Sequence, residues 1–168
     1  MPDDASSLTH LDPEGGVRMV DVGSKPGSVR TATAAGRVCL GKEAFHAVVE
    51  GTVTKGDVLC TAQVAGIQAA KRTPGLIPLC HPVALAGVEV TFDFCEEDFS
   101  IEVRACTKAV GQTGVEMEAL TAVTVACLTV YDMCKAISKD ILITDIRLLA
   151  KAGGASGAYE RAPKANRT

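Results

Sequence analysis

The sequence has no tryptophan, and aromatic residues make up only 4% of its 168 residues. Few side chains are therefore available to stack on exposed bases. It also lacks an excess of cations, because 17 basic against 20 acidic residues give a formal net charge of -3 at pH 7. We therefore predict no nucleic-acid partner, and any cations used for binding must be clustered locally.

Long hydrophobic runs and paired cysteine motifs are missing as well. The longest apolar stretch, 119–130, is interrupted by threonines and is shorter than the ~20 residues that cross a bilayer. The first four residues resemble no secretory signal. Seven cysteines occur without a C-x-x-C pair, which disfavours a zinc knuckle and favours reduced thiols. We expect a cytoplasmic protein with no membrane contact and no metal site.

The composition that remains is that of a folded protein, with 47% hydrophobic and 22% charged residues in a length that suits one domain. Residues 1–16 are polar and rich in proline and glycine, which predicts a flexible leader. Residues 17–152 are predicted to form a single α+β domain. Residues 153–168, opened by Gly153 and Gly154, are predicted to form a polar C-terminal tail.

Hydrophobic periodicity predicts the elements of this domain. Strands are predicted over 17–22, 29–40, 88–94, 101–105 and 141–149, where β-branched or alternating apolar residues recur. Helices are predicted over 42–49, 56–72 and 115–137, and Asp57 is a candidate N-terminal cap for the second. Without the short initial strand and the short helix, the order is β-α-β-β-α-β. This order predicts a ferredoxin-like α+β sandwich, with an antiparallel sheet packed on helices.

The last predicted helix is apolar on nearly all sides, which indicates burial on more than one face, against the sheet and a second subunit. Its charges lie at its ends: Glu116 and Glu118 at the start, Asp132 and Lys135 near the finish. At a rise of 1.5 Å per residue, Glu118 and Asp132 lie ~21 Å apart. If both ends serve one reaction, a neighbouring chain must bring them together at a subunit interface.

Each candidate also has a structural interpretation. Charges at helix ends can simply complement the helix dipole, and Lys55 can be a solvated lysine beside the cap at Asp57. His81 stands on a stiff connector between Pro78 and Pro82, where an imidazole can be aimed as a donor or acid. A structural histidine with its hydrogen bonds satisfied fits the same local sequence.

Two further charged residues stand where binding groups are often found. Asp21 shares a face with apolar residues of the first predicted strand, so it lies at an edge or has a function. Lys151 precedes Gly153-Gly154, and it is either a binding lysine or a solvated one. Cys80-His81 resembles a fragment of a metal site, but no ligand spacing supports zinc.

Several segments together match one known family. They are Leu8-Thr9-His10, Met19-Val20-Asp21-Val22, Lys55-Gly56-Asp57, Ala65-Gly66-Ile67-Gln68-Ala69-Ala70-Lys71-Arg72-Thr73, Leu76-Ile77-Pro78-Leu79-Cys80-His81-Pro82, Thr113-Gly114-Val115-Glu116-Met117-Glu118-Ala119-Leu120-Thr121 and Tyr131-Asp132-Met133-Cys134-Lys135-Ala136. From about Leu8 to Gly157 the sequence resembles the molybdenum cofactor biosynthesis accessory protein C family, the cyclic pyranopterin monophosphate synthases.

This resemblance implies that the 17–152 domain is catalytic and ferredoxin-like. The implied enzyme is a lyase that converts 3′,8-cyclo-7,8-dihydroguanosine 5′-triphosphate to cyclic pyranopterin monophosphate and releases pyrophosphate. The resemblance also implies a homohexamer built as a trimer of dimers, with active sites at the dimer interface. No cofactor is required by the sequence, although Mg²⁺ could accompany the triphosphate.

The resemblance also assigns site residues. It implies Asp132 as the active-site acid, Lys135 as its partner and Lys55 as the other lysine in general acid–base chemistry. The implied substrate-binding residues are Leu79, Cys80, His81, Met117, Glu118, Glu116, Asp21 and Lys151. For the triphosphate, Lys71, Arg72 or Arg30 could supply further cations.

A lysine acts as a base only if its pKa falls. We predict that crowding of Lys55 and Lys135 with Lys151 and His81 depresses the lysine pKa values, with Asp132 opposing that shift. Which lysine is neutral stays open. Two alternatives to the enzyme are a ferredoxin-like nucleotide-binding module and a thiol or metal protein. The complete set of proton-transfer groups disfavours the first, and the irregular cysteine spacing disfavours the second.

Overall fold

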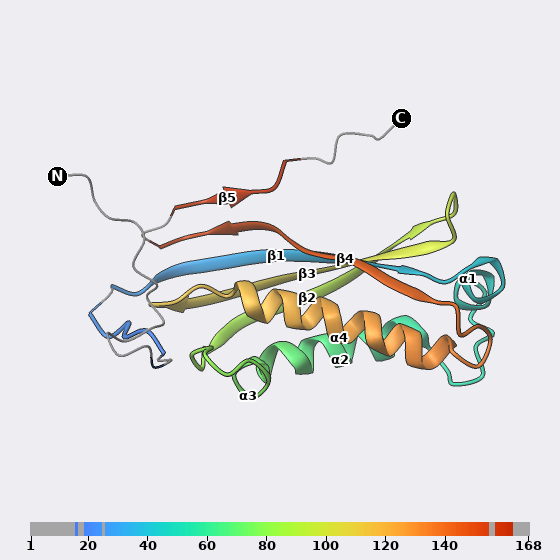
Figure 1. Cartoon of the computed structure of the whole chain (residues 1–168), viewed down its shortest axis with the longest axis horizontal. Coiled ribbons are helices and arrows are strands. Elements are labelled where there is room, and N and C mark those ends of the chain that lie inside the picture. The colour runs from blue at the N-terminus through green and yellow to red at the C-terminus, as the bar shows by residue number, and fades with distance from the viewer. Residues whose placement is uncertain (1–15, 17–18, 25, 155–156, 163–168) are drawn as a thin grey trace.

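The computed structural model describes residues 16, 19–24, 26–154 and 157–162 (Figure 1). Nearly all of the predicted leader, including Leu8-Thr9-His10, lies outside these residues. The strands are β1 (Ser28–Cys39), β2 (Leu85–Cys95), β3 (Ser100–Gly111), β4 (Leu142–Ala152) and β5 (Tyr159–Glu160). The helices are α1 (Lys42–Val49), α2 (Val58–Lys71), α3 (Thr73–Leu76) and α4 (Glu116–Cys134).

The strands form one sheet in the order β2-β3-β1-β4-β5, and every neighbouring pair is antiparallel. The helices α2 and α4 lie side by side along one face of this sheet, while α1 stands at one end of the molecule (Figure 1). The elements β1, α2, β2, β3, α4 and β4 follow the predicted β-α-β-β-α-β order. The predicted ferredoxin-like α+β sandwich is therefore confirmed.

Small residues let the long helix α4 lie close to the sheet. A Cβ atom added at Gly36 in β1 would come 2.5 Å from Ile146 Cδ1 and 2.8 Å from Val123 Cγ1. No side chain fits there, so the Val123 side chain of α4 packs directly on the β1 backbone. At its start, α4 is tied to the sheet by the buried Thr107 hydroxyl, which donates to the Val115 carbonyl at 2.9 Å. These contacts fix the position of α4 along the sheet.

By length and composition alone, α4 would also be long and apolar enough to cross a membrane. In this fold it is the central core helix, since it packs on α2 and on β1, β3 and β4. Half of its most apolar window is buried inside the molecule. Its hydrophobicity is thus explained by packing within the sandwich.

Two helix predictions hold closely. α1 has the predicted bounds, and α2 begins after Asp57, whose Oδ1 accepts a hydrogen bond from the Cys60 backbone N–H at 2.9 Å. This cap satisfies one of the free N–H groups of the first helical turn. It also fixes the end of the loop that carries Lys55.

The predicted first strand over 17–22 is wrong in its described part, because residues 19–22 belong to no strand. The backbone of this segment bonds to side chains instead: the Val20 carbonyl accepts from His81, and the Gly23 carbonyl accepts from Gln112. The β-branched composition reflects contact with a cavity here, not pairing in a sheet. Tertiary contacts override the local strand preference.

A short strand that the local sequence pattern does not predict lies in the predicted tail. Tyr159 and Glu160 form β5, which pairs with Lys151 and Ala150 of β4. The Arg161 backbone N–H donates to the Leu149 carbonyl at 2.8 Å and extends this contact. The end of β4 that carries Lys151 is therefore covered along its outer edge.

Candidate active site

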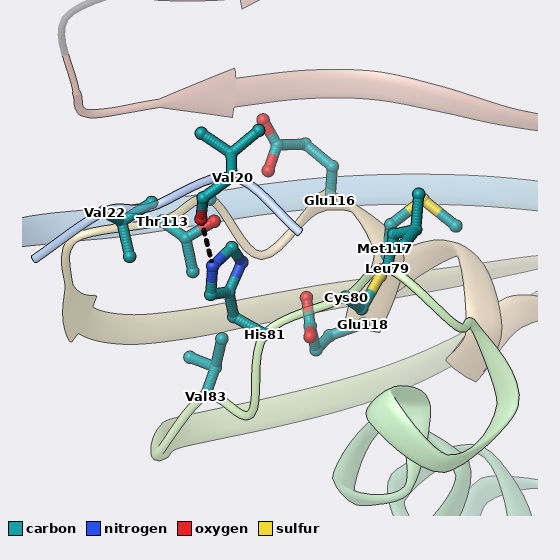
Figure 2. A pocket seen from close by; sticks show the side chains of 11 residues that line it. Val20, Val22, Leu79, Cys80, His81, Val83, Thr113, Glu116, Met117 and Glu118 are labelled. Carbon is teal, nitrogen blue, oxygen red and sulfur yellow. Dashed lines mark hydrogen bonds between the residues drawn. The ribbon is translucent and has the colours of Figure 1, made fainter. Parts of the chain in front are cut away.

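A cavity of about 330 Å³ lies beside the start of α4 (Figure 2). Three segments that are distant in the sequence form its walls: the 19–24 segment, the connector before β2, and the turn from β3 into α4. The lining residues are Val20, Val22, Leu79, Cys80, His81, Val83, Thr113, Gly114, Glu116, Met117 and Glu118.

Most of the predicted substrate-binding residues meet at this cavity. Leu79, Cys80, His81, Glu116, Met117 and Glu118 all line it. Lys151 reaches the same region, because its Nζ lies 3.4 Å from Glu116 Oε1. Asp21 does not line the cavity. It is exposed, and its Oδ1 accepts a hydrogen bond from the Gly23 backbone N–H at 2.8 Å, which closes a local turn.

His81 is oriented by one strong contact. Its Nε2 lies 2.7 Å from the Val20 carbonyl oxygen, and since a carbonyl only accepts hydrogen bonds, Nε2 is the donor. Figure 2 shows the other ring nitrogen, Nδ1, on the side of the ring away from Val20. The imidazole is thus held at Nε2, and Nδ1 has no hydrogen bond to any residue in the described ranges.

Glu118 is the most buried acid of the cavity, with 3% of its surface exposed. Burial raises the pKa of this carboxyl, and the nearby Glu116 raises it further, against a backbone hydrogen bond that lowers it. Burial, together with the charge of Glu118, also raises the pKa of the Cys80 thiol. Cys80 is therefore a protonated neutral group at neutral pH, and Glu118 is an acid that holds its proton more readily than usual.

A second cluster lies at the other end of α4 and contains Lys55, Asp132 and Lys135. Lys55 Nζ lies 2.8 Å from Asp132 Oδ2 and 2.7 Å from the Asp132 carbonyl oxygen. Lys135 Nζ lies 2.6 Å from Asp132 Oδ1. Hydrogen bonds from Lys135 and then Lys55 lower the pKa of Asp132 to about 2. The cluster brings together all three predicted catalytic residues.

The predicted depression of the lysine pKa values is wrong for Lys135. The hydrogen bond and charge of Asp132 raise its pKa above the usual lysine value. His81 and Lys151 belong to the opposite end of α4, so they do not crowd the lysines within one chain. In the single chain, the neighbouring carboxylate therefore decides the protonation of Lys135.

One chain thus carries two separate clusters, and we name each of them a half-site. The acidic half-site comprises His81, Glu116 and Glu118 at the start of α4, and the lysine half-site comprises Lys55, Asp132 and Lys135 near its end. The 14 helical steps from Glu118 to Asp132 span ~21 Å. No small substrate can touch both half-sites of the same chain at once.

The cations suggested for a triphosphate have other surroundings. Arg30 is buried, and its guanidinium donates to the Gly111 and Gln112 carbonyls at 3.2 and 3.4 Å. Gly154 lies directly over it, since a Cβ atom there would come 1.6 Å from Arg30 Nη1. Arg30 therefore holds the turn that leads into α4. Lys71 and Arg72 are exposed near the end of α2 and do not line the cavity.

Sequence reasoning missed the role of Gln112, whose Nε2 donates to the Gly23 carbonyl at 3.2 Å. No local pattern could have revealed a contact between residues 89 positions apart. In the part of the chain that the structure describes, no group of three or more His, Cys, Asp or Glu side chains could hold a metal ion. All seven cysteines are free, and burial raises the pKa of Cys127 to about 12.

The sequence is similar to those of several known proteins. The sequence model of the MoaC family matches residues 19–154. A cyclic pyranopterin monophosphate synthase of Salinibacter ruber is 62% identical over 157 residues, which cover 94% of this chain and 92% of that protein. The enzyme of the same name from Thermoanaerobacter pseudethanolicus is 54% identical over 92% of this chain and 98% of its own. A mitochondrial one from Arabidopsis thaliana is 54% identical over 94% of this chain and 58% of its own.

Proposed function

The chain belongs to the MoaC family, and on that premise we propose that it is a cyclic pyranopterin monophosphate synthase. The substrate is 3′,8-cyclo-7,8-dihydroguanosine 5′-triphosphate, and the products are cyclic pyranopterin monophosphate and pyrophosphate. This lyase reaction serves molybdenum cofactor biosynthesis. The observation that carries the proposal is the pair of half-sites at the two ends of α4, because together they supply the acids, bases and cations that the reaction needs.

The acidic half-site suits recognition of the guanine-derived ring. The N–H groups of this ring need hydrogen-bond acceptors, and the buried Glu118 and the Glu116 carboxylate supply them. The Nδ1 atom of His81 adds a hydrogen-bonding group, and the Lys151 ammonium adds a cation. Leu79 and Met117 supply the apolar walls for the flat ring.

The lysine half-site suits proton transfer and charge stabilisation. Rebuilding the ring moves several protons, and closing the cyclic phosphate develops negative charge that ammonium groups stabilise. Asp132, held ionised, keeps Lys55 and Lys135 in place. The hydrogen bond and charge of Asp132 raise the pKa of Lys135, so its side chain is a protonated ammonium group before substrate binds.

We propose further that two chains join their half-sites, in a homohexamer built as a trimer of dimers. The support is geometric, since the two clusters of one chain lie ~21 Å apart on a straight helix. Antiparallel apposition of two copies would set the lysines of one chain against Glu116 and Glu118 of the other, with complementary charge. We place the enzyme in the cytoplasm, with Mg²⁺ entering only as a counter-ion of the substrate triphosphate.

The direct test is to incubate the protein with the cyclised nucleotide and measure pyrophosphate and the pterin product by mass spectrometry. We expect both products in equal amounts from the wild type and from Lys42→Ala, a control at an exposed lysine on α1. Substrate that stays intact in the presence of folded wild-type protein would refute the proposed function.

Shared sites are tested by mixing inactive variants. Lys55→Ala and Glu118→Gln alter different half-sites, so a hybrid dimer retains one intact site, and random mixing should restore about a quarter of the wild-type activity. The matched control mixes Lys55→Ala with Asp132→Ala. These two residues share one half-site, so no intact site can form. Equal recovery, or none, in both mixtures would refute sites shared between chains.

A further inference from the structure

The 19–24 segment forms a wall of the cavity without belonging to any helix or strand. Two hydrogen bonds join it to the rest of the described chain. His81 Nε2 bonds to the Val20 carbonyl at 2.7 Å, and Gln112 Nε2 bonds to the Gly23 carbonyl at 3.2 Å. Two side chains therefore hold the backbone of this wall, and one of them, His81, also faces the cavity (Figure 2).

The Val20 carbonyl determines which nitrogen of His81 carries the proton. A carbonyl oxygen cannot donate, so Nε2 must be protonated while the 2.7 Å contact exists. In the neutral imidazole, Nδ1 then has the lone pair and acts as an acceptor. If the carbonyl moved away, either nitrogen could carry the proton, and the ring could turn.

Gln112 is well placed to hold this arrangement. It lies in the turn between β3 and α4, and its own carbonyl accepts a hydrogen bond from the buried Arg30 at 3.4 Å. The backbone of Gln112 is thus anchored to the sheet, while its side-chain amide reaches the Gly23 carbonyl. Gln112 can therefore hold the Gly23 carbonyl in a fixed position relative to the sheet.

We propose that Gln112 is a positioning residue. Its amide holds the 19–24 segment beside the cavity, so that the Val20 carbonyl keeps His81 in the Nε2–H form. The neutral His81 then presents Nδ1 to the substrate as a hydrogen-bond acceptor for an N–H or O–H group. This inference rests on the proposed function, because it takes His81 to contact the substrate.

The kinetic test compares two substitutions of Gln112. Gln112→Glu keeps the shape but sets an acceptor against the Gly23 carbonyl, and we expect kcat/KM to fall about fivefold, the effect of one lost hydrogen bond, mainly through KM. Gln112→Lys restores a donor and should return kcat/KM to within about twofold of wild type. The control is Gln63→Glu, since Gln63 Nε2 also donates to a backbone carbonyl, that of Val90, at 2.8 Å. It should leave kcat/KM unchanged.

The structural test needs no substrate. In ¹⁵N NMR spectra near pH 8, wild-type His81 should show a protonated Nε2 and an unprotonated Nδ1, and His81→Gln identifies its signals. Gln112→Glu should shift both signals toward a tautomer mixture and speed amide exchange across residues 19–24, whereas Gln63→Glu should do neither. Unchanged signals and exchange rates in folded Gln112→Glu would overturn the proposal, as would changed signals with unchanged kcat/KM. A wild-type protein without turnover would refute the proposed function instead, and the NMR signals would still decide whether Gln112 sets the His81 tautomer.

Discussion

The two ends of α4 hold their charged groups by opposite means. At the start, Glu118 is buried among segments from three parts of the chain, and burial raises its pKa. Near the end, Asp132 is exposed and held by two lysines that lower its pKa to about 2. One end is organised by the fold and the other by its own charges. The first should therefore be rigid before substrate binds, and the second should respond to its ionic surroundings.

The largest effect on turnover is expected when a residue of the lysine half-site is removed. Lys55→Ala and Asp132→Ala each remove a predicted proton-transfer group, and we expect turnover to fall about 10³-fold. The fold should persist because both side chains are exposed. Pyrophosphate release and thermal melting measure the two effects. Near-normal turnover in either variant would contradict the assigned roles.

A smaller effect is expected where the fold supports the lysine half-site. Asp57→Ala removes the cap of α2 and should cost about 1 kcal/mol of unfolding free energy. Because Asp57 ends the loop of Lys55, turnover should also fall, but far less than in Lys55→Ala. Urea unfolding and steady-state assays measure both quantities. Asp57→Asn retains a capping oxygen and should behave like wild type, and an equal loss there would contradict the capping role.

Opposite pKa shifts predict opposite pH dependences of stability. The raised pKa of Glu118 makes its contribution to stability complete below its unfolded pKa, and this contribution is lost as pH rises through the folded pKa. The melting temperature of Glu118→Gln should therefore equal that of the wild type in acid and exceed it at pH 7. Asp132 contributes above its unfolded pKa of about 3.9 and loses this as pH falls toward 2. Asp132→Asn should thus melt slightly below wild type at pH 7 and like it near pH 2.

Melting temperatures of both variants across pH 2 to 8 check these signs, with the wild type measured in parallel. The same sign for both variants at pH 7 would contradict the contrast between a buried and a paired carboxyl. The effect of Asp132 should be the smaller one, since exposed ion pairs contribute little.

Salt should give the smallest effect. At 0.5 M NaCl, screening weakens the exposed pairs of Asp132 with Lys55 and Lys135, so the pKa of Asp132 should rise toward its usual value. The pKa of the buried Glu118 should change less. Titration of both carboxyls by NMR at low and high salt measures this difference. A larger change in the pKa of Glu118 than in that of Asp132 would contradict the contrast between a buried carboxyl and an exposed, paired one.

Local patterns were enough to predict most of the fold, since the α4 hydrophobicity, the Asp57 cap and the β2–β3 alternation are properties of neighbouring residues. They failed where a distant contact decides. Residues 19–22 look like a strand, but the Val20 carbonyl bonds to His81 and the next residue, Gly23, bonds to Gln112. The short strand β5 forms by pairing with the outer edge of β4. The pKa of Lys135 is a different case, since the residue that raises it, Asp132, lies only three positions earlier on the same helix, and His81 and Lys151 lie at the other end of α4.

Because α4 packs closely over Gly36, the number of residues in this helix is constrained. Each residue of an α-helix turns the chain by about 100°, so one inserted residue would twist every side chain beyond it out of register. An insertion between Glu118 and Asp132 would rotate one half-site about the helix axis relative to the other, so one of the two would no longer face its present surroundings. The length of α4 therefore sets the spacing and the relative orientation of the two half-sites. We expect insertions and deletions in α4 to be harmful even at positions where substitutions are tolerated.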